Sequence, residues 1–566
     1  MQRHLARLST VNQFVLTLLS SVLIGFTYLP ILTVESGFPE VLFPPLSLPF
    51  CLIPIWFVWF RSESAKQNFL WGWLSQGIYN LIGFHWIYYT AQEFGHFPPV
   101  PSALILIAYV AFSALQFPLS GWLFAVLRKR LGLRSSPWSV QILLLIGVSS
   151  ALDTVFPQIF PWNFGYPWYW SHTQIFQNAE WIGFEGLSQV TYLINGLLLL
   201  GFMNLSRKKP EVEHFFQHNV KALLCLLTTI AILASLEING QRLLRNLPPA
   251  KRHAKILFVQ GNIGNHEKFY VERQSDFRTP IIDKYVDLTS EAVRNYNIAT
   301  SFDEKLKPDF VFWPETAFPG YLDALRRTNP DGLRLKELVE KTGIPLITGS
   351  YAGGENDDTY NGIYLVTKAS YPDMQAYHKR ILLAFGEYFP FGDRLPFLYD
   401  WFPAVSKFGR GAADQTLTLN DIKMFPQICY EGLYPVQASK SYQLEANLIV
   451  NVTNDSWFGD WLEPYQHLLM TMTRSVENRI SIARVTNTGI SAAVASSGAL
   501  IFQSPRGQEW AQVQEIPIYP TIPTFYQKIA GKVWLFWLTL FLLAFGVLVG
   551  SKLFEKHRLG TGSSEN

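Results

Sequence analysis

The chain of 566 residues is 49% hydrophobic and 15% aromatic, whereas only 16% of its residues are charged. Soluble proteins carry about 25% charged residues, so the composition excludes a disordered chain, a collagen or a coiled coil. It indicates a membrane protein with a soluble part attached. The net charge of +3 is too small to suggest a nucleic-acid partner, and three cysteines are too few for a disulfide framework.

Apolar segments fill the first part of the chain. A helix needs about 20 apolar residues to cross the roughly 30 Å hydrocarbon core, and most of these segments come close to that length. We expect a seven-helix membrane bundle at 1–245, a C-terminal transmembrane helix at 530–552 and a cytoplasmic tail at 553–566. The segments lie near 11–33, 41–60, 69–91, 103–127, 139–157, 183–202, 222–239 and 532–551. The third and fifth are interrupted by Gln76, Asn80, His85 and Asp153.

Lys and Arg are distributed unevenly among the loops between these segments. They concentrate after the second, fourth, sixth and eighth segments, whereas the loops 34–40, 92–102 and 158–182 contain none. By the positive-inside rule, both termini face the cytoplasm and residues 240–530 lie on the other side of the membrane. The first segment is too long for a signal peptide, so we expect it to be retained.

The region 252–525 has the pattern of a layered α/β or α+β domain. Short apolar strands alternate with polar helical stretches, and this alternation is typical of such domains. Strands are expected at 255–259, 309–313, 345–349, 362–367, 423–429 and 446–452, and helices at 279–298 and 331–342. The charge pattern places this domain on the non-cytoplasmic side of the membrane.

Three reactive side chains lie at or near strand ends in this region. Glu315 lies in WPETA, Lys379 in AYHKRILLAFGEYFP and Cys429 in PQICYEG. A thiol attacks as its thiolate, and a carboxylate such as Glu315 can take its proton. A lysine can lower the thiol pKa and stabilise an oxyanion, and the backbone N–H after Cys429 is a second candidate donor. Taken singly, each residue has an ordinary structural explanation: a buried thiol, a helix-capping carboxylate and a surface amine.

The joint order of the motifs is more specific. WPETA, a Lys ahead of FGEY, CYE and NVTNDSWFG follow one another, after FHWIYYTAQEF and PWNFGYP in the apolar region. The pattern resembles the nitrilase superfamily and its Glu-Lys-Cys triad. With seven predicted spans before the triad and one after it, the chain resembles the apolipoprotein N-acyltransferase family, a membrane-embedded branch of that superfamily. The resemblance covers nearly the full length.

The resemblance implies a multi-pass α-helical membrane bundle plus a nitrilase-like αββα sandwich domain. It implies that Glu315 is the general base, Lys379 the transition-state lysine and Cys429 the nucleophile. The supporting residues of the family match Glu387, Tyr430 and Glu431.

The implied reaction is a ping-pong acyl transfer. Cys429 would take an acyl chain from a phospholipid of the phosphatidylethanolamine type and hold it as a thioester. The chain would then pass to the α-amine of the N-terminal diacylglyceryl-cysteine of an apolipoprotein, in the last step of bacterial lipoprotein maturation. The implied location is the bacterial inner membrane, with the catalytic domain on the periplasmic side. No metal and no organic cofactor is implied, and we expect a monomer.

The predicted lipid contacts rest on aromatic residues. The stretch 394–411 mixes Leu, Phe, Tyr and Trp with two basic residues, and aromatics favour the membrane interface. We interpret it as a lipid-facing arm, with a packed aromatic loop as the alternative. Ala384 stands where many family members have Pro, and Phe269 where many have Trp. The lipid-contact candidates are Phe269, Trp401 and Phe402.

Two other function classes share parts of this pattern. A membrane-anchored nitrilase-type amidase with a soluble substrate needs the triad, but neither the aromatic arm nor eight spans. A transporter or scaffold with an inactive outer domain predicts many ionisable residues in the bundle and loss of triad residues. His467 has no second His, Cys or carboxylate at metal-ligand spacing, so we interpret it as a structural hydrogen-bonding residue.

Overall fold

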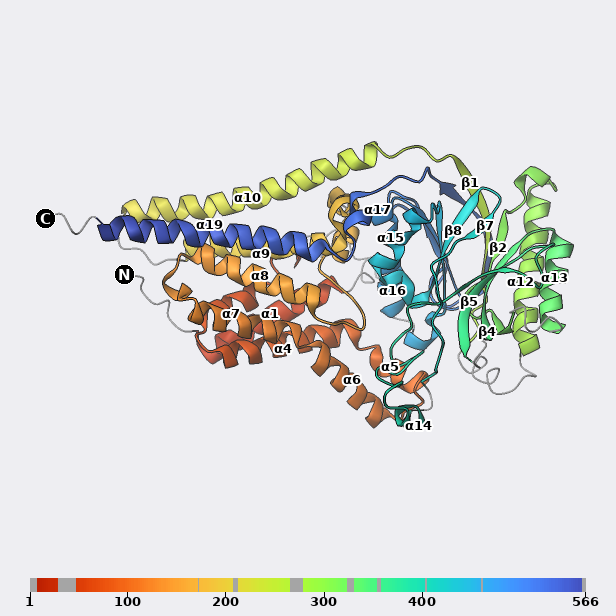
Figure 1. The fold of residues 1–566 in the computed structure, drawn as a ribbon, viewed down its shortest axis with the longest axis horizontal. Coiled ribbons are helices and arrows are strands. Elements are labelled where there is room, and N and C mark those ends of the chain that lie inside the picture. The colour runs from red at the N-terminus through yellow and green to blue at the C-terminus, as the bar shows by residue number, and fades with distance from the viewer. Residues whose placement is uncertain are drawn as a thin grey trace.

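The chain forms a helical bundle joined to a layered sandwich (Figure 1). The computed structural model describes residues 8–28, 47–171, 173–206, 212–264, 278–322, 330–353, 358–402, 405–459 and 462–561. Phe269, one of the predicted lipid contacts, lies outside these residues.

The bundle consists of the helices from α1 to α10 together with α19, which packs against α8 and α9. The helices are α1 Thr10–Thr27, α3 Ile53–Arg61, α4 Ala65–Phe84, α5 Ile87–Glu93, α6 Pro99–Ser113, α7 Gln116–Arg130, α8 Trp138–Val155, α9 Ala179–Leu205, α10 Val212–Arg245 and α19 Val533–Thr561. Among the described residues, five helical stretches are long and apolar enough to span a membrane, and Val533–Val547 is a shorter apolar helix. The second predicted segment, 41–60, falls partly outside the described residues. The arrangement of seven spans before the sandwich and one span after it therefore stays a prediction.

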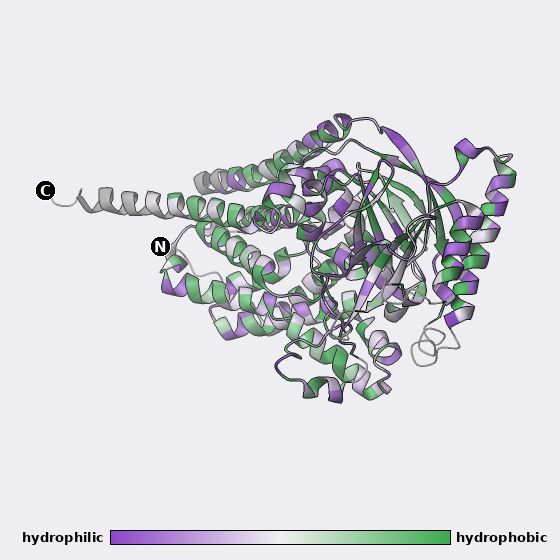
Figure 2. Ribbon diagram, turned by 45° about the vertical axis from the view of Figure 1, so that its right-hand side comes forward, coloured by the Kyte–Doolittle hydropathy of each residue, from purple (hydrophilic) through white to green (hydrophobic). Residues whose placement is uncertain are grey.

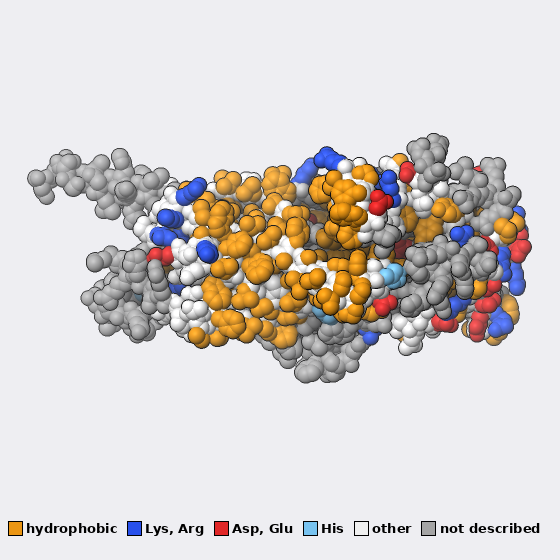
Figure 3. Space-filling model, turned by 90° about the horizontal axis from the view of Figure 1, so that it is seen from below, with side chains coloured by type: hydrophobic (Ala, Val, Ile, Leu, Met, Phe, Trp, Pro, Cys, Tyr) orange, Lys and Arg blue, Asp and Glu red, His pale blue; other side chains and the backbone are white. Residues whose placement is uncertain are grey.

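The outer surface of the bundle is apolar. Figure 3 shows a belt of hydrophobic side chains over the helical half, and Figure 2 shows the same helices as largely hydrophobic. Its exposed members include Leu104, Ile107, Phe112, Leu227 and Ile230. Water-soluble surfaces rarely expose contiguous apolar patches larger than a few hundred Å², so this belt fits contact with lipid. Lys and Arg gather at the end of the bundle away from the sheets (Figure 3).

Three of the polar residues that interrupt the apolar segments bind the region where α6 ends and α7 begins. Gln76 Oε1 accepts the backbone N–H of Phe117 at 2.6 Å. Gln116 Nε2 donates to Asp153 Oδ1 at 2.7 Å, and Asn80 Nδ2 donates to a serine at the end of α6 at 3.0 Å. The first N–H groups of a helix lack intrahelical partners, so Gln76 completes the start of α7. These polar residues therefore support the break between α6 and α7.

Two mixed β-sheets pack face to face in the sandwich. One has the order β13-β1-β2-β4-β5-β6, with β3 also pairing β4, and the other has the order β12-β11-β10-β9-β8-β7. The helices α12 Arg278–Ala299 and α13 Pro330–Thr342 lie outside the first sheet. The helices α15 Pro435–Gln443, α16 Glu463–Met472 and α17 Arg474–Asn478 lie between the second sheet and the bundle (Figure 1). The predicted αββα sandwich is thereby confirmed.

The strands are β1 Arg252–Gln260, β2 Phe310–Phe312, β3 Phe318–Tyr321, β4 Leu346–Gly353, β5 Thr359–Val366, β6 Gln375–His378, β7 Leu417–Leu419, β8 Ile422–Ile428, β9 Leu448–Thr453, β10 Ser481–Thr486, β11 Ala492–Val494, β12 Leu500–Gln503 and β13 Trp510–Ile518. The six predicted strands correspond to β1, β2, β4, β5, β8 and β9. Parallel strands buried on both faces read as continuous apolar runs, and β9 is buried throughout. The remaining strands are short or carry polar residues, so the sequence pattern missed them.

Polar contacts of buried side chains join the sandwich to the bundle. Arg479 Nε lies 2.8 Å from Glu180 Oε2, at the start of α9. Glu477 Oε1 accepts the backbone N–H of Phe184 at 3.0 Å, and its other oxygen lies 2.9 Å from Arg474 Nη1. Removing one partner of a buried pair leaves an uncompensated charge and costs about 3–5 kcal/mol. These contacts therefore hold the two parts in one relative position.

Candidate active site

The candidate nucleophile sits in a strained turn. Cys429 directly follows β8 and begins a short 3₁₀ helix, Cys429–Leu433. Its φ is +47°, in the left-handed region that residues other than glycine rarely adopt. Such conformations persist where the surrounding structure enforces them, and they cluster at functional sites. The residue is also buried, so the turn holds the thiol in one place inside the protein.

Glu315 is placed by a close approach of two strands. It lies just after β2, ahead of Thr316, which also has a left-handed φ of +49°. Gly349 of β4 lies against this turn, and a Cβ there would come within 2.6 Å of both Glu315 Cα and the Thr316 nitrogen. Any side chain at position 349 would push the turn away. The glycine of ITGS therefore helps to place Glu315.

Lys379 lies between two carboxylates. It follows β6, and its Nζ is 2.7 Å from Glu387 Oε1 and 3.8 Å from Glu315 Oε1. The side chain of Lys379 is only 1% exposed. Asn361 of β5 donates through Nδ2 to Glu315 Oε1 at 2.7 Å and to Glu387 Oε1 at 3.3 Å. The structure thus brings three of the predicted site residues together, with Asn361 bridging the two acids.

The charges around the thiol set its protonation. Burial on its own lowers the pKa of Lys379, but the charges of Glu387 and Glu315 outweigh burial and leave that pKa raised. Burial and Glu315 raise the pKa of the Cys429 thiol, and the opposing effect of Lys379 is smaller. The resting site therefore holds an ammonium ion and a neutral thiol. A thiol in this state needs a base before it can attack.

Glu387 is presented by a tight turn. Ala384 pairs with Tyr388 in an isolated bridge, and Phe385 between them has a φ of +65°. The second oxygen of Glu387 accepts the backbone N–H of Leu383 at 2.8 Å. Ala384, which stands where many family members have Pro, therefore lies in the turn that directs the carboxylate of Glu387 toward Lys379.

Glu431 ties the lysine segment to the cysteine turn. Its Oε1 accepts the hydroxyl of Tyr377 and the backbone N–H of Arg380, both at 2.8 Å, and its Oε2 accepts the N–H of Ile428 at 2.9 Å. Burial raises the pKa of Glu431, although these backbone N–H groups lower it. Glu431 is thus a structural support for the site.

Tyr430 connects the cysteine turn to the bundle. Its hydroxyl donates to the carbonyl oxygen of Ile159, and its ring lies 6.0 Å from that of Phe160. Because Tyr430 follows the nucleophile directly, these contacts fix the thiol relative to the bundle.

Two of the predicted lipid contacts, Trp401 and Phe402, lie where the sandwich meets the outer end of the bundle. Trp401 ends the short helix α14 Phe397–Trp401 and is 70% exposed. The ring of Phe402 lies 5.5 Å from Phe389 and 6.5 Å from Phe97 of the bundle. Figure 1 shows α14 beside α5 and α6. Trp401 is exposed whereas Phe402 packs against other rings, so the arm and the packed loop both stay predictions.

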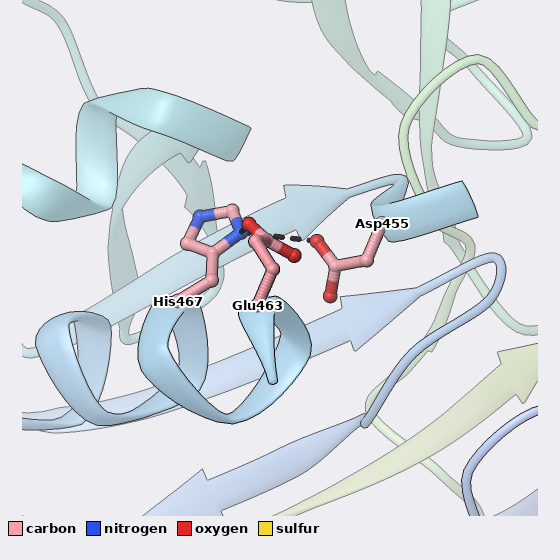
Figure 4. Close-up of side chains that lie close together, drawn as sticks. All are labelled: Asp455, Glu463 and His467. Carbon is pink, nitrogen blue, oxygen red and sulfur yellow. Dashed lines mark hydrogen bonds and ion pairs between the residues drawn. The ribbon is translucent and has the colours of Figure 1, made fainter. Parts of the chain in front are cut away.

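One premise behind the interpretation of His467 as a structural hydrogen-bonding residue needs a correction. Its Nδ1 lies 3.0 Å from Asp455 Oδ1 and 3.5 Å from Glu463 Oε1, and the three side chains point toward one another (Figure 4). The expectation that no carboxylate lies at metal-ligand spacing is wrong, because Glu463 is four residues away on one face of α16. Three such acceptors can hold a metal ion. However, Arg484 Nη2 lies 2.8 Å from Asp455 Oδ2, so the protein itself already supplies a positive charge next to this carboxylate.

Comparisons with known proteins cover both parts of the chain. A family model described as "Carbon-nitrogen hydrolase" matches residues 255–518. Another, described as "Apolipoprotein N-acyltransferase N-terminal domain", matches residues 32–197.

Several relatives match over most of their length. "Apolipoprotein N-acyltransferase" of Bdellovibrio bacteriovorus is 35% identical over 545 residues, which cover 94% of this chain and 92% of that protein. The protein of the same name from Photobacterium profundum is 27% identical over 458 residues, 79% of each. Among solved structures, a CN-hydrolase superfamily protein from Xanthomonas campestris matches with a TM-score of 0.31 and 17% identity. The match covers 47% of this chain and 90% of that one.

Proposed function

This chain belongs to the apolipoprotein N-acyltransferase family, and from this we propose that it completes bacterial lipoprotein maturation. In that reaction it transfers an acyl chain from a phospholipid to the α-amino group of the N-terminal diacylglyceryl-cysteine of apolipoproteins. The observation that carries the proposal is the buried Lys379, held between Glu315 and Glu387 beside the strained Cys429 turn.

The first half-reaction acylates the enzyme. Glu315 takes the proton of the Cys429 thiol, and the sulfur attacks the ester carbonyl of the phospholipid. Lys379 and the backbone N–H of Tyr430 stabilise the oxyanion of the tetrahedral intermediate. When the intermediate collapses, the C–O bond breaks and the proton on Glu315 passes to the leaving oxygen. A lysophospholipid departs and a thioester remains on Cys429.

The second half-reaction releases the chain to the acceptor. The neutral α-amine of the apolipoprotein attacks the thioester carbonyl, and Glu315 takes a proton from the attacking nitrogen. The C–S bond breaks, an amide forms, and the proton returns to the sulfur of Cys429. Donor and acceptor thus react in turn at one thiol. Every group in this scheme comes from a single chain, so the reaction needs no second subunit, and we propose a monomer.

The membrane placement follows from the surface of the molecule. The apolar belt of the bundle supports a multi-pass location in the inner membrane. The Lys and Arg residues at the end away from the sheets support a cytoplasmic position for that end and a periplasmic position for the sandwich. Both substrates have lipid tails, and a site where the sandwich meets the outer end of the bundle suits them.

Intact-protein mass spectrometry tests the proposal. Purified enzyme mixed with phosphatidylethanolamine alone is expected to gain the mass of one fatty acyl chain on Cys429. The adduct disappears when a diacylglyceryl-cysteine peptide is added, and the peptide gains the same mass. Absence of an adduct, together with hydrolysis of a small amide, would contradict the proposal and favour the amidase.

The exposed aromatic of α14 provides a second test. Trp401→Ser is expected to raise KM for phospholipid in vesicles about tenfold or more, because burying a large apolar side chain contributes about 1.5–3 kcal/mol. The value of kcat stays near that of the wild type, since no triad group changes. Initial rates over a range of vesicle concentrations measure both constants.

A matched control for Trp401 lies on the sandwich beyond α12. Phe302 is 69% exposed, close to the 70% of Trp401, and Phe302→Ser is expected to leave KM unchanged. An equal change in KM for both variants, or no change for Trp401→Ser, would count against a lipid-facing arm.

A further inference from the structure

The carbonyl of the nucleophile has a specific partner. His467 Nε2 lies 3.2 Å from the carbonyl oxygen of Cys429. A carbonyl oxygen only accepts, so Nε2 carries the hydrogen. In a trans peptide the C=O and the following N–H point in opposite directions. The ring of His467 therefore binds one end of the Cys429–Tyr430 peptide group, and the N–H of Tyr430 points the other way.

Buried groups hold the ring of His467 in this orientation. Asp455 Oδ1 lies 3.0 Å from Nδ1, and Asp455 itself is bound by Arg484 at 2.8 Å and by the hydroxyl of Thr453 at 3.2 Å. Burial opposes ionisation of Asp455, but the charges of Arg484 and His467 lower its pKa. All of these residues are buried. They form a continuous line of contacts from Arg484 to the nucleophile.

The contacts at the two ring nitrogens decide where the hydrogens lie. Asp455 Oδ1 and the carbonyl oxygen of Cys429 are both acceptors, so a cationic His467 donates to the first from Nδ1 and to the second from Nε2. Burial and the charge of Arg484 lower the pKa of His467, whereas Asp455 and the carbonyl of Cys429 raise it. A neutral ring with its hydrogen on Nδ1 would set a lone pair against the carbonyl of Cys429. The contact at Nε2 therefore selects a ring that carries a hydrogen on Nε2.

We propose that His467 is a positioning residue for the oxyanion donor of Tyr430, and this inference rests on the proposed function. The bond from Nε2 fixes the plane of the Cys429–Tyr430 peptide group in its strained turn. It also polarises that group, because hydrogen bonds in series strengthen one another in a buried environment. The N–H of Tyr430 is thereby a better-aimed and stronger donor to the tetrahedral intermediate.

Two reactions of the same thiol separate this role from a general structural one. Acylation by phosphatidylethanolamine passes through an oxyanion, whereas alkylation by iodoacetamide is a displacement at saturated carbon and needs no oxyanion donor. In His467→Phe, which fills the site but cannot donate, acylation is expected to fall about 10- to 100-fold. Removing an oxyanion donor outright costs about 10²–10³-fold, and here the donor remains but is misdirected. The alkylation rate is expected to stay within about twofold of the wild-type rate.

Two further variants complete the experiment. His467→Gln keeps an N–H donor and is expected to recover most of the lost acylation rate. If His467→Phe does not purify as a folded protein, His467→Met replaces it, since methionine also cannot donate.

Several results would overturn the inference. Acylation at the wild-type rate in His467→Phe would contradict the positioning role of His467. An equal loss of acylation and alkylation would contradict it as well. Stoichiometric metal in the purified wild type, measured by inductively coupled plasma mass spectrometry, would show that Nδ1 binds an ion together with Asp455 and Glu463. If the wild type itself forms no acyl adduct, the proposed function fails and the inference fails with it. If the wild type forms the acyl adduct and His467→Phe forms it at the same rate, only the inference fails and the proposed function stands.

Discussion

Replacing Cys429 with alanine is expected to abolish the acyl adduct and to lower acyl transfer by about 10⁴-fold or more. Losses of this size follow when the nucleophile of a covalent mechanism is removed. Neither Glu315 nor Lys379 can form the thioester that the proposed reaction requires. Intact-protein mass spectrometry detects the adduct, and chromatography of the peptide product measures transfer.

The other cysteines provide the control for this substitution. Cys225 lies half-buried in α10, and Cys225→Ala is expected to form the adduct at the wild-type rate. Cys429→Ala should keep its melting temperature within a few degrees, because alanine removes a single sulfur atom. An acyl adduct that persists in folded Cys429→Ala would place the nucleophile elsewhere.

Replacing Lys379 with methionine is expected to cost both activity and stability. The substitution leaves Glu315 and Glu387 buried beside each other without a cation, and breaking a buried ion pair in this way costs about 3–5 kcal/mol. Acylation falls about 10³-fold, since an oxyanion donor and the cation beside the thiol are lost together. Single-turnover acylation and thermal unfolding in detergent measure the two effects.

The pH dependence of the stability lost in Lys379→Met follows from the direction in which the pKa of Lys379 is shifted. The carboxylates raise the pKa of Lys379 in the folded state, so its contribution to stability is fully present below the ordinary lysine pKa of about 10.4. It is lost only as the pH rises through the folded-state value. Lys379 itself therefore introduces no pH dependence into the stability difference between pH 6 and pH 8.

An exposed ion pair provides the matched control for Lys379. Lys336 Nζ lies 3.9 Å from Glu340 Oε1 on α13, and the two side chains are 39% and 43% exposed. Pairs of this kind contribute about 0–1 kcal/mol, so Lys336→Met should change melting temperature slightly and acylation not at all. An equal loss of stability in both lysine variants would argue against the special role of the buried cation.

Strand-end positions and motif order were the parts of the site that the sequence revealed. Glu315 and Cys429 each follow a strand with a clear apolar run, β2 in one sheet and β8 in the other. The packing of the two sheets brings these strand ends together. Lys379 follows β6, a four-residue strand with no clear pattern. Its place depended on the resemblance to the family.

Contacts between distant segments could not be predicted in the same way. Asn361 lies within an apolar strand, and nothing local shows that it bridges Glu315 and Glu387. The cluster around His467 had one readable signal, the spacing of four residues to Glu463 on a helix. The approach of Asp455 depends on the loop after β9, and the sequence pattern does not encode its path.

Contacts between distant segments also explain why the sequence pattern missed several strands. β13 pairs with β1 across more than 200 residues of chain, and its residues alternate between polar and apolar with no turn signal to mark a hairpin. The break between α6 and α7 also lay inside one apolar segment. It is stabilised from a distance by Gln76, so local hydropathy did not reveal it.

Under the proposed function, the ion pair between Arg479, which follows α17, and Glu180 of α9 fixes the depth of the reaction in the bilayer. With Arg479 bound to Glu180, and with Tyr430 anchored on the loop at Ile159, the thiol cannot rise or sink relative to the bundle. The ester groups of phospholipids lie at a nearly constant depth, whereas the ends of their chains do not. An enzyme built this way selects its donor by where the ester lies rather than by how long the chain is. We therefore expect it to accept chains of different lengths and to respond to the thickness of the surrounding membrane.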